Sequence, residues 1–174
     1  MLFRVAEPRN GWFRAADAVE AGVARQQLAR FAASGVVQRS AHGIYRLCDF
    51  PATPFEDVIE ACLWAGPDAV AGHGTALAVH GLGDAMPAVI HLIVPRRFRK
   101  HRAGVVVHQA TLDRRDLTVR GGVPVTTVER TIRDLAADGE SPDSVVALVA
   151  EAERLGVVSH RHATALRSEI MAVT

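Results

Sequence analysis

The sequence predicts a mixed α+β protein, in which an N-terminal winged helix-turn-helix precedes a domain made of a small β-sheet covered by helices. Two observations carry this prediction. Residues 11–47 contain two short amphipathic helical patterns that are separated by a glycine and followed by two β-rich runs around a second turn. Further along the chain, helical patterns alternate with short strand-like runs, as is typical of a small sheet packed against helices.

A linker with two prolines, residues 49–54, separates two predicted domains, 1–50 and 51–174. The first domain has seven arginines against four acidic residues, a net charge of +3. The second has 13 basic residues against 15 acidic ones, a net charge of −2. Because binding to phosphates requires positive charge, this asymmetry points to nucleic-acid binding by the N-terminal domain.

The composition excludes several classes of protein. With 49% hydrophobic residues in 174, the chain has enough apolar side chains for a core. It has neither a long apolar run nor a signal-peptide pattern, so we expect a cytoplasmic protein without a membrane partner. Cys48 and Cys62 have no CxxC or CxxH spacing, and we expect both to be reduced.

The N-terminal domain has the pattern of a recognition helix. A short helix at 2–9, ended near Pro8, is followed by predicted helices at 14–21 and 24–33. The second of these has one apolar face, and its polar residues lie largely outside that face: Arg25, Gln26, Gln27 and Arg30. Arginine pairs with guanine edges and glutamine with adenine edges, so we expect this helix to read DNA. The alternative is an ordinary solvated helix face.

A wing is predicted after this helix. Residues 36–39 pair with 44–47 across a turn in which Gly43 takes a positive φ. We expect Tyr45 to pack the wing onto the helices. Three further candidate DNA contacts lie on or beside the wing: Arg39, His42 and Arg46.

In the second domain we expect helices at 55–64, 73–80, from Thr126 or Thr127 to Ala137, at 142–155 and from Ser159 onward, and strands at 88–94, 104–109 and 122–125. The loop between the first two strands is the most basic stretch of the chain, since six of its residues 96–102 are basic or histidine. It predicts a secondary contact to nucleic acid or to an acidic partner, made by Arg96, Arg97, Arg99, Lys100 and Arg102. The alternative is a solvated β-hairpin loop.

Four histidines in the second domain, His73, His80, His91 and His108, lie where they could converge. They have no HxxxH or HExxH spacing, and isolated histidines usually serve as structural hydrogen-bonding groups. We therefore expect neither a metal site nor any other cofactor.

The sequence does not predict an enzyme. It has no GxSxG, Walker or DxD motif. Two spacings of four residues, Arg130 with Asp134 and Glu129 with Arg133, are explained by ion pairs along a helix.

Segments in both domains are typical of a known family. In the first domain they run from Gly11–Phe13 through Ala21–Val23 to Gly43–Leu47. In the second they are GPDAVAGHGTALAVHGL (66–82), VIHLIVPRR (89–97) and GVPVTTVERTIRDLA (122–136). In these segments both domains resemble the AbiEi family of bacterial abortive-infection antitoxins. Where relatives commonly carry a Ser or Thr helix cap, this chain has Arg14 and Ala24, and each lost cap is expected to cost about 1 kcal/mol.

The resemblance implies an antitoxin that binds operator repeats, represses its own operon and counteracts a cognate nucleotidyltransferase-type toxin. Because one winged helix reads few base pairs, we expect two copies on repeated half-sites, by dimerisation or by cooperative binding. Two other functions stay open: a solitary transcriptional regulator whose second domain senses a ligand or dimerises, and a nucleic-acid-processing enzyme that uses the basic loop.

Overall fold

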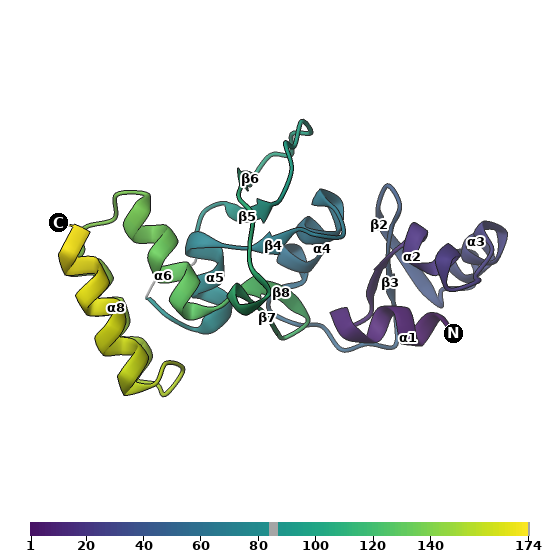
Figure 1. Ribbon diagram of the computed structural model, residues 1–174. Coiled ribbons are helices and arrows are strands. Elements are labelled where there is room, and N and C mark those ends of the chain that lie inside the picture. The colour runs from purple at the N-terminus through teal and green to yellow at the C-terminus, as the bar shows by residue number, and fades with distance from the viewer. Residues whose placement is uncertain (84–86, 174) are drawn as a thin grey trace.

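The structure, a computed structural model, describes residues 1–83 and 87–173 and has the predicted mixed α+β architecture. A three-stranded sheet lies towards the N-terminal end of an elongated molecule, a five-stranded sheet lies in the middle, and α8 lies at the far end (Figure 1). No helix among the described residues is long and apolar enough to cross a membrane.

The N-terminal unit is a winged helix-turn-helix. Its elements are α1 (Leu2–Ala6), the 3-10 turn η1 (Glu7–Arg9), β1 (Trp12–Arg14), α2 (Ala15–Glu20), α3 (Arg25–Ala33), β2 (Val37–Ala41) and β3 (Ile44–Leu47). The strand order is β1-β3-β2, and both pairings are antiparallel. The predicted wing is therefore present, with Gly43 at φ 73° in its turn. β1 was not predicted, because three residues are too few to show an alternating pattern.

Tyr45 lies at the centre of this small sheet. It is opposite Phe13 of β1 and Arg39 of β2, and its ring stacks on that of Phe13 with centroids 5.8 Å apart. It packs against the buried residues beneath α2 and α3. The prediction that Tyr45 joins the wing to the helices is confirmed.

The second unit contains a five-stranded mixed sheet with helices. Its elements are α4 (Glu56–Ala65), β4 (Val70–Ala71), α5 (His73–His80), β5 (Ile90–Val94), β6 (Val105–Gln109), the 3-10 turn η2 (Arg114–Asp116), β7 (Leu117–Arg120), β8 (Val123–Thr126), α6 (Val128–Ala137), α7 (Pro142–Arg154) and α8 (His160–Val173). The strand order is β6-β5-β4-β8-β7. β4 and β7 were not predicted, because β4 has two residues and every residue of β7 is exposed, so neither shows strand periodicity.

The basic loop does not close a β-hairpin. β5 and β6 pair in parallel, from Ile90 opposite Val105 to Val94 opposite Gln109, so the loop carries the chain back along the sheet. The hairpin-loop interpretation of this segment is therefore wrong. The ten residues between Val94 and Val105 are fewer than the dozen or more that a connection between parallel strands usually needs, so the length of the loop favoured a hairpin.

Buried residues form three clusters. One lies beneath the winged helix and includes Phe13, Leu28 and Val37. Another joins α5 to the three C-terminal helices. The cluster between α4, α5 and the five-stranded sheet also includes Trp12 and Ile44 of the N-terminal sheet, so the two units share buried side chains.

Two polar contacts cross between the units. Asn10 donates from Nδ2 to the carbonyl oxygen of Gly121 at 2.6 Å, in the turn between β7 and β8. Arg46 of β3 forms an ion pair of 2.9 Å with Glu56 of α4. Together with the shared cluster, these contacts hold the winged helix against the second sheet.

The two helices that begin after Arg14 and Ala24 lack a Ser or Thr cap, and a side chain from the first turn of each helix compensates for it. The carboxylate of Asp17 accepts a hydrogen bond from the backbone N–H of Arg14 at 3.2 Å, and the amide oxygen of Gln27 accepts one from that of Ala24 at 2.9 Å. Each helix therefore keeps one of the two hydrogen bonds of a capping box, the one that the side chain of the third helical residue accepts from the backbone N–H of the cap residue.

Candidate nucleic-acid interface

The outer face of α3 presents the polar residues that the sequence assigned to DNA. Arg25, Gln26, Gln27 and Arg30 are all exposed, while Leu28 between them is 2% exposed and anchors the helix in the core. Because Gln27 uses its amide oxygen to cap the helix, its NH₂ group is the part left to face a ligand. The helix therefore exposes two guanidinium groups and two amides around the side that is not buried.

The tip of the wing adds positive charge to this unit. Arg39 and His42 are exposed, and Nη2 of Arg39 lies 3.3 Å from Nδ1 of His42. Nε of Arg39 also donates to the carbonyl oxygen of Ala41 at 3.4 Å. These contacts keep the arginine close to the hairpin tip.

Arg46 is placed differently from the other six predicted contacts. Its side chain is 15% exposed, and Nη2 donates to the carbonyl oxygen of Phe50 at 2.9 Å while pairing with Glu56. Its guanidinium holds the junction between the two units together. Contact with DNA stays a prediction for Arg46, and it would require the ion pair to open.

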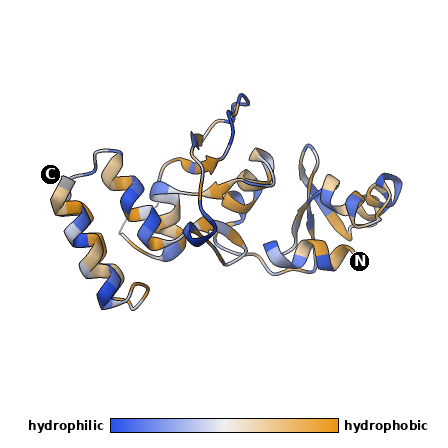
Figure 2. Cartoon of the chain, in the orientation of Figure 1, coloured by the Kyte–Doolittle hydropathy of each residue, from blue (hydrophilic) through white to orange (hydrophobic). Residues whose placement is uncertain are grey.

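The basic loop is anchored at two points and exposed between them. The ring of Phe98 meets the edge of Trp64 at a centroid distance of 5.0 Å, and Arg102 pairs with Glu60 of α4 at 3.3 Å. The other basic residues of the predicted secondary contact are exposed: Arg96, Arg97, Arg99 and Lys100. In Figure 1 the loop and the tip of the β2–β3 hairpin project towards the same edge of the view, and Figure 2 shows strongly hydrophilic residues at the loop tip and on α3.

Ion pairs around α6 partly follow the prediction. Arg130 pairs with Asp134 at 2.8 Å as expected, and it also reaches Asp116 at 3.0 Å. The predicted ion pair between Glu129 and Arg133 is not formed, so this prediction is wrong. Both side chains instead reach across to α8, Arg133 to Glu169 at 2.7 Å and Glu129 to His162 at 3.0 Å, because α8 brings partners that periodicity along one helix does not show.

Three of the four histidines come together on one side of the five-stranded sheet. The rings of His73 and His108 stack with centroids 3.9 Å apart, and Nδ1 of His91 lies 3.0 Å from Nε2 of His108. Nδ1 of His73 lies 2.9 Å from a carboxylate oxygen of Asp138. His80 lies apart from them and hydrogen-bonds the carbonyl oxygen of Thr126 at 2.7 Å. Asp138 was missed by sequence reasoning, because only the fold brings the end of α6 to the histidines.

The electrostatics of this cluster favour the neutral form of two of its imidazoles, those of His91 and His108. Burial lowers the pKa of His108, and the neighbouring His73 lowers it further. Burial likewise lowers the pKa of His91, with a further contribution from His108. The ring nitrogens of His91 and His108 therefore remain available as acceptors or ligands near neutral pH.

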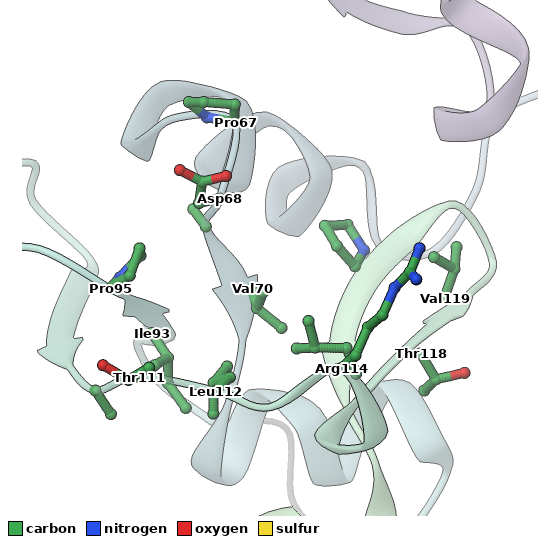
Figure 3. Close-up of a pocket in the computed structure, with 14 residues that line it drawn as sticks. Pro67, Asp68, Val70, Ile93, Pro95, Thr111, Leu112, Arg114, Thr118 and Val119 are labelled. Atoms are coloured by element: carbon green, nitrogen blue, oxygen red, sulfur yellow. The ribbon is translucent and has the colours of Figure 1, made fainter.

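A largely apolar groove of about 630 Å³ lies beside the strands β4, β5, β7 and β8. Figure 3 shows Val70, Ile93 and Leu112 lining it, with the charged groups of Asp68 and Arg114 on opposite sides. A groove of this size and lining resembles sites that hold small apolar ligands.

The two cysteines differ in burial and reactivity. Cys62 is buried, and burial raises the pKa of its thiol to about 12, so the thiolate that attacks substrates is not formed at neutral pH. Cys48 is free and exposed.

Comparison with known families gives matches to both parts of the chain. The family described as a transcriptional regulator, AbiEi antitoxin, matches residues 1–47. The family described as the AbiEi antitoxin C-terminal domain matches residues 69–169. No curated protein sequence matches the chain. Among solved structures, the RV2827C protein from Mycobacterium tuberculosis is similar, with 15% identity, a TM-score of 0.49, and coverage of 97% of this chain and 75% of that one.

Proposed function

The chain belongs to the AbiEi antitoxin family, and from this premise we propose that it represses its own operon through residues 1–50 and counteracts a nucleotidyltransferase-type toxin through residues 51–174. Family membership makes it an antitoxin and a transcriptional regulator. The proposal adds three points: that the chain represses its own operon, that the toxin is a nucleotidyltransferase, and that each part of the chain has one of these two roles.

The exposed face of α3 is the observation that carries the DNA-binding half of the proposal. Arg25 and Arg30 extend from a helix that is fixed from below by Leu28, and the wing adds Arg39 beside it. Arginine and glutamine on a rigid helix are suited to base edges, while a basic wing is suited to phosphates. The remaining predicted contacts supplement this face.

Repeated half-sites follow from the small size of this surface. A helix of nine residues can read only a few base pairs, which does not specify one site in a genome. We propose that two copies bind adjacent repeats, as a dimer or cooperatively. A stoichiometry of one chain per operator would contradict this part of the proposal.

The DNA-binding half is tested with the full chain and its own promoter. Replacing Arg25 and Arg30 together with Ala should weaken binding, and each of the two that contacts a phosphate should make the slope of log K against log salt shallower by about 0.9. Arg161→Ala, an exposed arginine of α8, is the matched control and should leave the slope unchanged. If the double variant and the Arg161→Ala control changed the affinity and the salt slope equally, the arginines of α3 would not contact DNA.

The basic loop is tested in the same assay. Replacing Arg97, Arg99 and Lys100 with Ala should lower the salt slope by up to about 2.7 if all three contact phosphates. An unchanged slope would assign the loop to a protein partner or to solvent.

The antitoxin half is tested by co-expression with the gene next to this one in the genome, which the proposal expects to encode a nucleotidyltransferase. The full chain should relieve toxicity, and the variant with Ala at positions 25 and 30 should still do so if the second unit counteracts the toxin. Failure of the full chain to rescue, with promoter binding retained, would favour the solitary regulator. The apolar groove beside β5 supports that second candidate, because it has the size of a ligand-sensing site.

A further inference from the structure

We propose that His73, His108 and Asp138 form a binding site for a divalent transition-metal ion, with Zn²⁺ as the best-matched ion, and that His91 holds His108 in place. This site lies in the second unit, away from the predicted DNA contacts of α3 and the wing, and the proposal does not depend on the action on a toxin. It brings together residues from three elements, the start of α5, the strand β6 and the end of α6.

The ligand atoms are close to coordination distance. One nitrogen of each histidine and one oxygen of Asp138 all lie within 4.8 Å of one another. Around a tetrahedral zinc ion, N and O ligands at about 2.0–2.1 Å from the metal are separated by about 3.3 Å. Side-chain rotations that shorten these separations by at most about 1.5 Å therefore suffice to place all three atoms around one ion.

His73 carries two signs of a site built around its imidazole. It is 7% exposed, and its Nδ1 makes no well-directed hydrogen bond within the described part of the chain, although Asp138 lies 2.9 Å away. Because this nitrogen and this oxygen are close without a hydrogen bond between them, the lone pairs of both atoms are free to bind a cation. The backbone of His73 is also left-handed, with φ 50°, and such strain at a residue other than glycine is concentrated at functional sites.

The surroundings suit a metal ion. A cavity of about 180 Å³ is lined by the three ligands together with Arg130 and Asp134. The guanidinium of Arg130 is paired with Asp134 and Asp116, so its charge is balanced and does not repel a cation. Asp138 is exposed, which leaves an entry path and room for a water ligand.

His91 is a positioning residue in this arrangement. Its Nδ1 lies 3.0 Å from Nε2 of His108, which leaves Nδ1 of His108 for the metal. Ligating histidines commonly make such a hydrogen bond through their second nitrogen, and its loss lowers metal affinity about 10- to 100-fold.

Two histidines and one carboxylate select the class of ion. Imidazole favours zinc and other late transition metals over Mg²⁺ or Ca²⁺, which prefer sites made of oxygen ligands. The alternative is a metal-free network of hydrogen bonds between the same side chains. That network predicts no metal uptake beyond surface binding.

The test uses the full chain without a histidine tag, stripped with a chelator and reloaded with Zn²⁺. We expect about one zinc per chain by mass spectrometry of the metal, and a rise in the unfolding temperature of roughly 5–10 °C at a hundredfold excess over Kd. Asp138→Asn and His108→Gln should each abolish the stoichiometric zinc. His91→Gln should keep the stoichiometry at saturating zinc and weaken affinity about 10- to 100-fold.

Matched controls separate the site from adventitious binding. His101→Gln and Asp143→Asn change exposed residues of the same types outside the cluster and should bind zinc like the original chain. The unfolding temperatures of the metal-free variants show whether each variant is folded, and Asp138→Asn changes an exposed side chain. The proposal is overturned if the original chain takes up no zinc, or if the control variants lose zinc as much as the cluster variants do.

Discussion

The winged helix and the five-stranded sheet differ in how their cores are completed. The winged helix has its own cluster around Phe13 and Leu28. The core on the sheet side is completed by two side chains from the winged helix, Trp12 and Ile44. Trp12 and Phe13 are neighbours on β1, and since successive residues of a strand face opposite sides, one strand supplies both cores.

This difference shows how a DNA-binding unit can be fixed to its neighbour. The linker after the wing contains prolines, but buried packing crosses between the units as well. The orientation of α3 is therefore set by side chains rather than by the linker alone. Three predictions test this coupling, and a fourth tests the stability of the second unit.

Trp12→Ala should have the largest effect, a loss of about 3–5 kcal/mol in the free energy of unfolding. Removing this large buried side chain would leave a cavity between the units. We expect a single urea transition to separate into two as the units uncouple. Phe13→Ala is the matched comparison, since it removes a buried ring from the winged helix alone. A loss below about 1 kcal/mol at Trp12 would show that the shared cluster does not couple the units.

Gly122→Ala should have the next largest effect, about 2–3 kcal/mol. Its φ is 80°, and an added Cβ would lie 2.9 Å from Nδ2 of Asn10 at the junction. Gly121→Ala is a close control, because φ is 57° and an added Cβ meets nothing within 4 Å. It should cost only about 1–2 kcal/mol of backbone strain. If chemical denaturation gave the same loss in the free energy of unfolding for both variants, the side chain of Asn10 would move away from the added Cβ at little cost.

The sequence predicted the second half of the winged helix better than the junction. The amphipathic pattern of α3 and the glycine of the wing are local signals, and both elements formed where they were expected. Trp12 and Ile44 carry the same apolar signal as any core residue, so the sequence could not show that they belong to a different core from Phe13. Which core an apolar residue joins depends on contacts made far along the chain.

The same distinction applies to the candidate sites. The exposed polar residues of α3 could be predicted because they belong to one helix and lie outside its apolar side. The histidine cluster could not, since His73, His91 and His108 belong to separate elements and Asp138 ends another. The inward position of Arg46 was also hidden, because its partner Glu56 lies beyond the predicted boundary.

Glu56→Gln should lower the free energy of unfolding by about 0.5–1 kcal/mol, since the pair with Arg46 is partly exposed. A double-mutant cycle with Arg46→Gln measures the coupling directly. The same variant sharpens the role of Arg46 in DNA binding. If the freed guanidinium reaches DNA, the affinity for the promoter rises, and an unchanged affinity would assign Arg46 to the junction alone.

A decrease in pH should have the smallest effect. Burial lowers the pKa of His80 in the folded chain, so the unfolded chain binds the proton first. Stability is therefore highest above the unfolded pKa of about 6.5 and falls as the pH decreases through it. Urea unfolding at pH 7.5, 6.5 and 5.5 checks this, and His80→Gln should flatten the dependence more than His101→Gln. An equal slope in both variants would assign the effect to other groups.

The shared cluster also has a consequence for synthesis on the ribosome. The winged helix emerges first, with Trp12 and Ile44 still exposed, because their partners in α4 and β8 are made later. β8 must then reach back to pair Val125 with Ala71 on the two-residue strand β4. The nascent chain therefore carries an apolar surface until most of the second sheet has been translated. A chain that stops after the wing would keep that surface exposed permanently and be prone to aggregation.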